Sequence, residues 1–314
     1  MKIHMGTGSS ISVIIPTFNG EKWLEDLLNM LERQTLPPAE VLIVDSGSAD
    51  TTCNIAKRHN VRLEQIAQKD FDHGGTRSAA AGLVFGDILV YMTQDAIPAA
   101  ENVLERLVSP LLKDEKIAAT YGRQLAHKDA TLFSEHLRSF NYPSVSEVRC
   151  WKDRKRLGFR TIFISNSFAA YRRNVLAAHG FFPTRLLFGE DTLTIAKFLE
   201  NGYCVEYVSE ACVYHSHNYS IWQEFKRYFD IGVFHVDQHE QLMKFGGPAA
   251  RGKQYVFSEL ALILQKKKYL LLPESLLRSG CKFAGYNLGR HYRKLPRSLG
   301  SLLSMNHRWW SGAV

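Results

Sequence analysis

The sequence predicts an α/β protein whose mostly parallel sheet is flanked by helices, followed by a helical, basic C-terminal extension. Runs typical of strands and of helices alternate through the first hundred residues, which is the order of a parallel sheet with crossover helices. The strand runs are continuously apolar, as in strands that are covered on both faces. From Ser220 onward the pattern becomes helical.

The first half of the chain supplies strands and helices in strict alternation. The run EKWLEDLLNML repeats apolar residues every third or fourth position, so one face of the expected helix is apolar. Thr17 and Asn19 stand where the N-cap of that helix is wanted. We expect strands at 11–15, 41–44, 61–67 and 88–93, and helices at 21–31, within 45–59 after a turn, and at 76–85.

The second half is less regular. Residues 126–160 are aromatic and charged, and the segment WKDRKR within them predicts an exposed loop. Gly202 is placed to end a helix. We expect helices at 101–112, 190–202, 221–235 and 255–272, strands at 117–125 and 203–217, and a strand leading into a helix at 161–173.

The net charge of +8 belongs to the C-terminal fifth of the chain. Residues 1–250 hold 27 Lys and Arg against 29 Asp and Glu, whereas residues 251–314 hold 12 against 2. This asymmetry indicates an anionic partner: a lipid surface, a nucleic acid or a phosphorylated substrate. Interleaved apolar residues favour a membrane surface, with Trp309 and Trp310 at the interface, over an oligomer contact or helix packing.

Cysteine usage and the N-terminal segment bear on the compartment. The five cysteines (Cys53, Cys150, Cys204, Cys212, Cys281) include no CxxC pair, so we expect free thiols in a reducing environment. No run approaches the ~18 apolar residues of a membrane-spanning helix. We therefore expect a cytoplasmic protein, free or peripheral on the inner face of the cytoplasmic membrane. Residues 1–10, polar and Gly/Ser-rich, predict a tag-like or disordered start.

Polar groups follow three of the expected strands. Pro16 to Asn19 follow the first strand, Asp45 to Ser48 the second, and Thr93 to Asp95 the fourth. In open parallel sheets, ligands bind beyond the carboxyl ends of the strands. The sequence therefore predicts a binding site at this edge, although Asn19 and Asp45 would also serve as turn and cap residues.

These segments together resemble the glycosyltransferases of family 2, which have the Rossmann-like GT-A fold. The resemblance covers residues 11–235 and leaves 236–314 as a separate helical, basic region. The phrases FDHGGTR and TQDAIP are most similar to bacterial rhamnosyltransferases that use dTDP-L-rhamnose in O-antigen and related polysaccharide synthesis. The other matching segments are ISVIIPTFNGEKWLEDLL, VLIVDSGSADTT, ISNSFAAYRR, FGEDTLTIAKFLENGY and VYHSHNYS.

The resemblance implies a nucleoside diphosphate sugar as donor, either dTDP-rhamnose or a UDP-sugar. Asp45 would accept a hydrogen bond from the imide N–H of the base, and Arg77 would offer its guanidinium to the pyrophosphate or base. The family has asparagine after that arginine, where this chain has Ser78. The remaining donor-side candidates are Pro16, Thr17, Asn19, Ser46, Gln94 and Asp95.

A divalent cation, Mg²⁺ or Mn²⁺, is also implied. The family carries an Asp-x-Asp type motif after the fourth strand, and here Gln94 and Asp95 stand in that place. Asp95 is then the hard anionic ligand, while the phosphates of the substrate supply further oxygens. A histidine reaches the metal or diphosphate in related enzymes. His215 and His217 would point to the same side of a strand, so both remain candidates.

The resemblance assigns the chemistry to a pair of acids at a helix N-terminus, Glu190 and Asp191. Inverting transfer needs one carboxylate to take the proton of the acceptor hydroxyl. The second acid has this role in the family, so we expect Asp191 to be the base and Glu190 to orient the acceptor or cap the helix. Asn166 and Ser167 would lie near the acceptor, a saccharide that is free or linked to a polyprenyl diphosphate.

The sequence is less compatible with two other functions, a nucleotidyltransferase and a nucleic-acid-binding protein. A nucleotidyltransferase should have a dense glycine run near the first strand, whereas this chain has Gly20 and Lys22 alone. A nucleic-acid-binding protein could use the basic, aromatic tail, but the acidic N-terminal part bears the predicted site. We therefore expect no nucleic acid partner, and a homo-oligomer remains an alternative.

Overall fold

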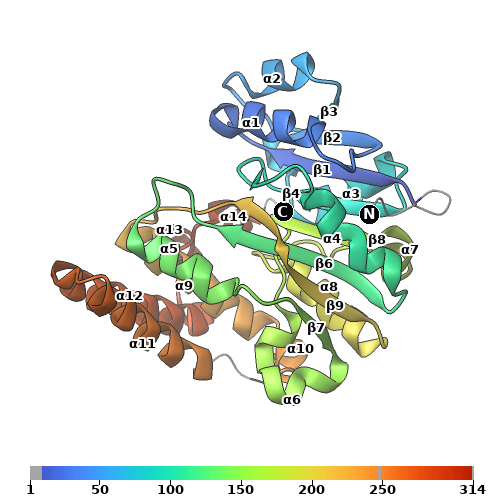
Figure 1. Cartoon of the computed structure of the whole chain (residues 1–314). Coiled ribbons are helices and arrows are strands. Elements are labelled where there is room, and N and C mark those ends of the chain that lie inside the picture. The colour runs from blue at the N-terminus through green and yellow to red at the C-terminus, as the bar shows by residue number, and fades with distance from the viewer. Residues whose placement is uncertain (1–8, 247–248, 313–314) are drawn as a thin grey trace.

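A single mixed sheet lies at the centre of the computed structural model, which describes residues 9–246 and 249–312 (Figure 1). Along the sheet the strands follow the order β3-β2-β1-β4-β8-β6-β9-β5, and β7 pairs with β9. The strands are β1 (Ile11–Thr17), β2 (Glu40–Asp45), β3 (Arg62–Gln65), β4 (Ile88–Met92), β5 (Ile97–Pro98), β6 (Ile117–Leu125), β7 (Glu147–Cys150), β8 (Phe168–Arg172) and β9 (Cys204–Tyr214).

The first four strands run parallel, as the alternation predicts. Beyond them β8 is antiparallel to both of its neighbours, β4 and β6, while β6 and β9 are parallel to each other. An antiparallel strand needs no crossover helix. The segment 161–173, expected as a strand leading into a helix, begins with the end of a 3-10 helix at Gly158–Ile162 and a loop. Its strand starts only at Phe168 and is followed by a helix from Arg173.

Helices cover both faces of the sheet. Their bounds are α1 (Glu21–Glu32), α2 (Thr52–Arg58), α3 (His73–Leu83), α4 (Val103–Lys113), α5 (Leu132–Asn141), α6 (Arg154–Leu157), α7 (Arg173–Ala178), α8 (Glu190–Glu200), α9 (Ile221–Asp237), α10 (His239–Met243), α11 (Ala249–Gln265), α12 (Leu272–Arg290), α13 (Arg297–Leu303) and α14 (His307–Ser311). The segment expected as an exposed loop, WKDRKR, instead forms a 3-10 turn and the start of α6.

Alternation along the central strands divides the core in two. Ile14 of β1 faces the cluster that includes residues of α3 and α8, whereas Val13 and Ile15 face the cluster that includes α1 and α4. All three side chains are fully buried. The sheet edge that bears the predicted site is therefore held rigidly from both faces.

Two of the cysteines contradict the expectation of free thiols. Cys150 and Cys204 are opposite each other in the antiparallel pair of β7 and β9 and form a disulfide, with their Cα atoms 4.4 Å apart. The other three (Cys53, Cys212 and Cys281) are free. The sequence could not reveal the pair because the two residues are 54 positions apart and meet only through strand pairing.

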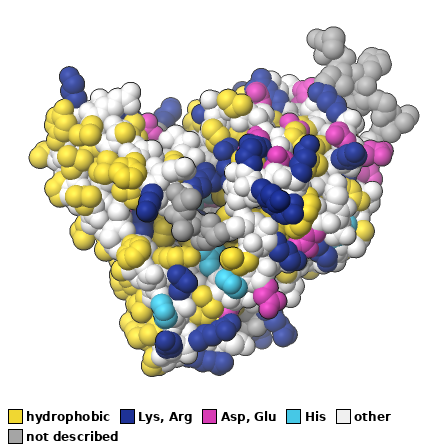
Figure 2. Space-filling view, turned by 90° about the horizontal axis from the view of Figure 1, so that it is seen from below, with side chains coloured by type: hydrophobic (Ala, Val, Ile, Leu, Met, Phe, Trp, Pro, Cys, Tyr) yellow, Lys and Arg dark blue, Asp and Glu magenta, His cyan; other side chains and the backbone are white. Residues whose placement is uncertain are grey.

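The C-terminal helices divide into two groups. In Figure 1, α11 and α12 project from the body of the molecule, and Figure 2 shows hydrophobic side chains gathered over this end. By contrast, Trp310 of α14 is only 8% exposed and packs near Phe229 of α9, so the expected interfacial role is wrong for this residue. Among the described residues, no helix combines the length and apolar character needed to cross a membrane.

Three regions are expected from the sequence: residues 1–10, 11–235 and 236–314. Residues 1–8 of the predicted tag-like start lie outside the described residues, and Ser10 is hydrogen-bonded through its N–H to Asp87. The boundary proposed at position 235 falls within α9, which continues to Asp237.

Gly189, immediately before α8, tests how tightly this helix start is held. Its φ is +85°, and a Cβ there would lie 2.6 Å from the Phe234 ring. Gly180 has a similar φ of +82° but open space around it, so it is the matched control. We expect Gly180→Ala to lower the free energy of unfolding by ~1 kcal/mol from the left-handed backbone alone. Gly189→Ala should cost a further ~1–3 kcal/mol from overpacking.

Urea titrations of both variants measure the difference. Equal losses of unfolding free energy at the two positions would contradict the close packing of Phe234 against the start of α8.

Candidate active site

Sheet pairing brings the first predicted site residues together. Thr17 lies opposite Asp45 in the parallel pair of β1 and β2, and β4, which leads to Asp95, pairs with the other side of β1. Pro16 is partly exposed one residue before Thr17. The amide N–H and the hydroxyl of Ser46 both donate to the carbonyl of Thr17, which fixes the strand ends to each other.

The Asp45 carboxylate is fully buried and bonded within its own loop. Oδ1 accepts from the N–H groups of Gly47 and Ser48, and Oδ2 accepts from the hydroxyls of Thr17 and Ser48. Burial alone would raise the pKa of this carboxyl, but the hydrogen bonds from Ser48 and Thr17 outweigh it and lower the pKa. Asp45 is therefore an ionised anchor of the strand edge.

The side chain of Gln94 connects the loops after β1 and β4 by hydrogen bonds. Its amide oxygen accepts from the N–H of Phe18 at 2.9 Å, and its amide nitrogen donates to the carbonyl of Phe18 at 3.0 Å. This paired contact holds the loop after β1 against the loop after β4. The neighbouring Asn19, at a φ of +48°, accepts from the N–H of Ala49 and so ties the same loop to the one after β2.

Asp95, His215 and His217 form one cluster. Nε2 of His215 is 3.4 Å from one Asp95 oxygen, and Nε2 of His217 is 3.7 Å from the other. The three possible ligand atoms all lie within 4.8 Å of one another. Because β9 ends at Tyr214, both histidines lie in the loop after this strand rather than on it. That loop allows both rings to reach the same carboxylate.

The electrostatics of this cluster favour metal ligands in their binding forms. Burial would raise the pKa of Asp95, but the hydrogen bond and charge of His215 hold it well below its usual range. Burial, together with the charge of His215, lowers the pKa of His217 to about 4. At neutral pH the carboxylate is therefore ionised and the His217 ring is neutral, with a lone pair free for a cation.

Two residues that sequence reasoning missed orient His215. Its Nδ1 is 2.9 Å from Oε1 of Gln124, near the end of β6, and Arg138 of α5 donates to the same oxygen. All three side chains are buried. Because Oε1 can only accept, Nδ1 of His215 donates to Gln124, and this contact turns Nε2 toward Asp95. No local sequence pattern predicts this contact, because Gln124 and Arg138 are distant from His215 in the sequence.

The second cluster surrounds Glu190. Arg77 of α3 donates to its carboxylate at 3.0 Å, and Nδ2 of Asn166 donates at 3.2 Å. The hydroxyl of Tyr171 donates to the oxygen of Asn166, which fixes the amide orientation. Burial would raise the pKa of Glu190, but the charge of Arg77, together with smaller contributions that include the hydrogen bond from Asn166, lowers it. Arg77, expected at the pyrophosphate or base, is engaged here in a buried ion pair.

Asp191 lies next to this ion pair in a different environment. It is partly exposed, and its oxygens accept from the backbone N–H groups of Asn166, at 3.1 Å, and Thr192, at 2.7 Å. Burial and then the negative charge of Glu190 raise the pKa of Asp191. Two adjacent carboxyls thus have opposite shifts, a pattern typical of one structural and one proton-transferring acid.

Residues 165–167 connect the two clusters. The Ser165 hydroxyl accepts from Nε2 of Gln124, behind His215, while Asn166 binds both acids. The carbonyl of Ser167 accepts from the N–H of Thr93, two residues before Asp95. The candidates Asn166 and Ser167 therefore lie between the clusters, and in this structure their backbone holds both sides in place.

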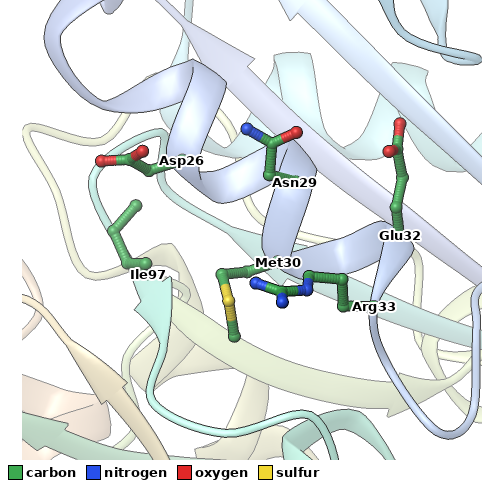
Figure 3. Close-up of a pocket in the computed structure, with 6 residues that line it drawn as sticks. All are labelled: Asp26, Asn29, Met30, Glu32, Arg33 and Ile97. Atoms are coloured by element: carbon green, nitrogen blue, oxygen red, sulfur yellow. The ribbon is translucent and has the colours of Figure 1, made fainter.

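A surface hollow is lined by residues of α1 and β5 and the residue after α1 (Figure 3). Its lining, Asp26, Asn29, Met30, Glu32, Arg33 and Ile97, includes none of the clustered site residues. Its lining has no convergent buried polar groups of the kind found in the two clusters, so the strand edge, and not this hollow, is the candidate site.

Comparison with known sequences identifies relatives along nearly the whole chain. The family model for glycosyl transferase family 2 matches residues 12–180. The O-antigen chain rhamnosyltransferase RfbN of Salmonella typhimurium is 41% identical over 303 residues, 96% of this chain and 96% of that protein. The O-antigen chain rhamnosyltransferase WbaN of Salmonella anatum is 41% identical over 305 residues, with the same coverage of each chain.

Solved structures confirm the predicted GT-A fold. The mannosyltransferase PcManGT from Pyrobaculum calidifontis, in complex with GDP-Man and Mn²⁺, superposes with a TM-score of 0.57 at 18% identity, covering 96% of this chain and 85% of that one. The glucosyl-3-phosphoglycerate synthase from Mycobacterium tuberculosis, with Mn²⁺, UDP and glucosyl-3-phosphoglycerate, gives a TM-score of 0.54 at 19% identity, covering 77% and 81%.

The raised pKa of Asp191 has a consequence for stability. The folded chain binds the Asp191 proton more tightly than the unfolded chain, so this group makes unfolding easier as pH rises from the ordinary aspartate pKa, about 4, through its raised value. We expect Asp191→Asn to remove that loss, so its stability relative to the parent should increase between pH 5 and pH 8.

Urea unfolding at the two pH values measures this, with Asp26→Asn, at an exposed position of α1, as control. A relative stability of Asp191→Asn that falls with rising pH, or that follows the control, would refute the raised pKa.

Proposed function

This chain belongs to glycosyl transferase family 2, and we propose that it is an inverting enzyme that transfers L-rhamnose from dTDP-L-rhamnose to a hydroxyl of a saccharide acceptor. The two relatives named as O-antigen chain rhamnosyltransferases support the choice of sugar. The acceptor is then a growing saccharide, carried on a polyprenyl diphosphate at the inner face of the cytoplasmic membrane. A UDP-hexose is the alternative donor, because an imide N–H is common to uracil and thymine.

The observation that carries this proposal is the arrangement of two clusters around residues 165–167. One cluster offers an ionised carboxylate and imidazoles for a charged phosphate group and its cation. The other offers a partly exposed carboxylate with a raised pKa. A displacement at an anomeric carbon needs a stabilised leaving group on one side and a base on the other.

The donor binds at the strand edge in this proposal. Pro16, Thr17 and Asn19 line the base and ribose, and Asp45 keeps the loop after β2 in place through its hydrogen bonds. Since both Asp45 oxygens already accept hydrogen bonds, a base imide would share one of them rather than find it vacant. Gln94 contributes by clamping the loop after β1, not as a metal ligand, because its oxygen is bound to Phe18.

The donor set of Asp95, His215 and His217 fits a divalent cation such as Mn²⁺ or Mg²⁺. One carboxylate oxygen and two imidazole nitrogens suit Mn²⁺ somewhat better, and neutral His217 is ready to bind. Such an ion, when bound, neutralises the negative charge of the diphosphate. Gln124 and Arg138 orient the His215 ring so that Nε2 faces Asp95.

Asp191 acts as general base. It takes the proton of the acceptor hydroxyl while that oxygen bonds to the anomeric carbon and the bond from this carbon to the diphosphate oxygen breaks. Its raised pKa makes it a stronger base than an ordinary aspartate while it still ionises near neutral pH. Glu190 supplies part of that shift and is itself held by Arg77 and Asn166.

Thermal shifts identify the donor and the metal site together. We expect dTDP with Mn²⁺ to stabilise the protein more than UDP or GDP with Mn²⁺, because dTDP is part of the proposed donor. A ligand at 100 times its Kd adds ~2.7 kcal/mol to the free energy of unfolding. His217→Ala should lose the Mn²⁺-dependent part, whereas His291→Ala, at an exposed histidine at the end of α12, should keep it. A larger shift with UDP than with dTDP would reject the rhamnosyl donor and favour a UDP-hexose.

The base is tested by kinetics on dTDP-L-rhamnose, followed as release of dTDP. Asp191→Asn should lower kcat by roughly 10²–10⁴-fold. Because kcat/KM rises with pH as the base ionises, removing the charge of Glu190 should move this rise to lower pH in Glu190→Gln. Full activity in Asp191→Asn, or a rise moved to higher pH in Glu190→Gln, would exclude Asp191 as the base.

The α11–α12 arm supports a lipid surface as partner. Large apolar side chains are exposed along it (Figure 2). Leu270, between α11 and α12, is 95% exposed and follows the exposed Lys267 and Lys268 in the chain. Apolar side chains flanked by cations match an anionic membrane. Among the described residues of the arm, the exposed large apolar side chains are Phe257, Leu264, Tyr269, Leu270, Leu276, Leu277 and Phe283.

Vesicle flotation tests this surface. We expect binding to phosphatidylcholine vesicles that contain phosphatidylglycerol, and roughly tenfold or greater weakening in Lys267→Glu/Lys268→Glu, at ~1 kcal/mol per lysine. Lys57→Glu on α2 should bind as the parent does. Concentration-dependent dimers without vesicle binding would instead assign the arm to a second copy of the chain.

A further inference from the structure

The last helices of the chain lie on two loops of the active site. Arg308 donates from its guanidinium to the carbonyl of Gln68, in the segment before α3. Trp309 donates from Nε1 to the carbonyl of Arg185 at 3.1 Å, and Asn306 donates from Nδ2 to the carbonyl of Leu187 at 3.3 Å. Three side chains within four positions thus hold backbone carbonyls of loops far away in the sequence.

The two loops are also joined to each other, through the side chain of Asp72. One oxygen of Asp72 caps α3 by accepting from the N–H of Gly75 at 2.6 Å, and the other accepts from the N–H of Arg185 at 3.2 Å. Gly74 lies against the carbonyl of Pro183 so closely that a Cβ has no room. The first loop leads into α3 and Arg77, and the second leads into Glu190 and Asp191.

The second loop has a conformation that needs external support. Phe181 and Arg185 have φ values of +57° and +59°, which are unfavourable for residues with a side chain. Such backbone persists where surrounding contacts determine it. Arg185 is held on both sides, since its N–H binds Asp72 and its carbonyl binds Trp309.

The C-terminal segment is itself anchored in the body of the protein. The N–H of Met305 donates to the buried Asp230 of α9 at 2.9 Å, and Trp310 packs in one hydrophobic cluster with Leu187 and Phe229. The cluster therefore extends from α14 to within three residues of Glu190. This segment is part of the structure around the site, not a free tail.

We propose that residues 305–310 act as a clamp that positions the catalytic acids, with Arg308 and Trp309 as positioning residues. The clamp fixes the loop before α8 against the loop before α3, and so holds Asp191 and the Arg77–Glu190 pair in register. Its effect on turnover rests on the proposed role of Asp191, whereas its effect on the loops does not. A misplacement of ~1 Å at a reacting group costs up to about 10²-fold in rate.

The test compares Arg308→Ala/Trp309→Phe with Arg297→Ala, an exposed arginine at the start of α13. The Trp309→Phe change keeps an aromatic ring and removes the N–H donor. Hydrogen exchange is followed at the amides of residues 181–192, and release of dTDP from dTDP-L-rhamnose gives kcat, KM and the pH profile. Binding of dTDP with Mn²⁺ reports the donor side separately.

We expect faster exchange in this loop, a kcat lowered about tenfold or more, a donor KM within about threefold of the parent, and an altered pH profile. Arg297→Ala should match the parent in each measurement. Unchanged exchange overturns the clamp, and faster exchange with unchanged kcat and pH profile overturns its positioning role. If the parent releases no dTDP, the proposed donor fails, and exchange alone decides whether the clamp holds the loop.

Discussion

The buried ion pair between Arg77 and Glu190 is the contact on which the rest of the active site depends. It joins α3 to the first residue of α8, and Asn166 adds the segment before β8 through a second hydrogen bond to the same carboxylate. Breaking such a pair by removing one partner typically costs ~3–5 kcal/mol, because a charge is then left buried. Three segments that are distant in sequence are fixed by one carboxyl group, and this arrangement also positions Asp191. Burial and then the charge of Glu190 raise the pKa of Asp191.

The four carboxylates of the candidate site differ in their surroundings and in the direction of their pKa shifts. Asp45 and Glu190 are buried with several donors and have lowered pKa values, so they are permanent anions that fix loops. Asp95 is likewise an anion, but its partners are two imidazoles able to bind a cation with it. Of these four, only Asp191 has a raised pKa, and its side chain is partly exposed. A raised pKa together with access to solvent is what a general base requires.

The sequence predicted the parts of the fold that follow from local pattern. The alternating runs predicted the parallel order of β1 to β4, and the polar residues after those strands predicted the edge where Thr17, Asp45 and Asp95 lie. It did not predict the antiparallel β8, the Cys150–Cys204 disulfide, or the contact of Gln124 and Arg138 with His215. Each of these depends on pairing between distant segments. The assignment of Trp310 to a membrane interface was wrong for the same reason. A tryptophan near cations has the same local sequence pattern whether it contacts lipid or packs on α9.

A crystal structure of the protein with Mn²⁺ and dTDP would locate the metal by its anomalous scattering and the nucleotide by its density. We expect one manganese position bounded by Asp95, His215 and His217 and shared with the diphosphate. The thymidine should lie along Thr17 and Asn19, and the Asp191 carboxylate should face the open side of the terminal phosphate. Manganese bound by Glu190 and Asp191, or a nucleotide bound away from the ends of β1 and β2, would contradict this expectation.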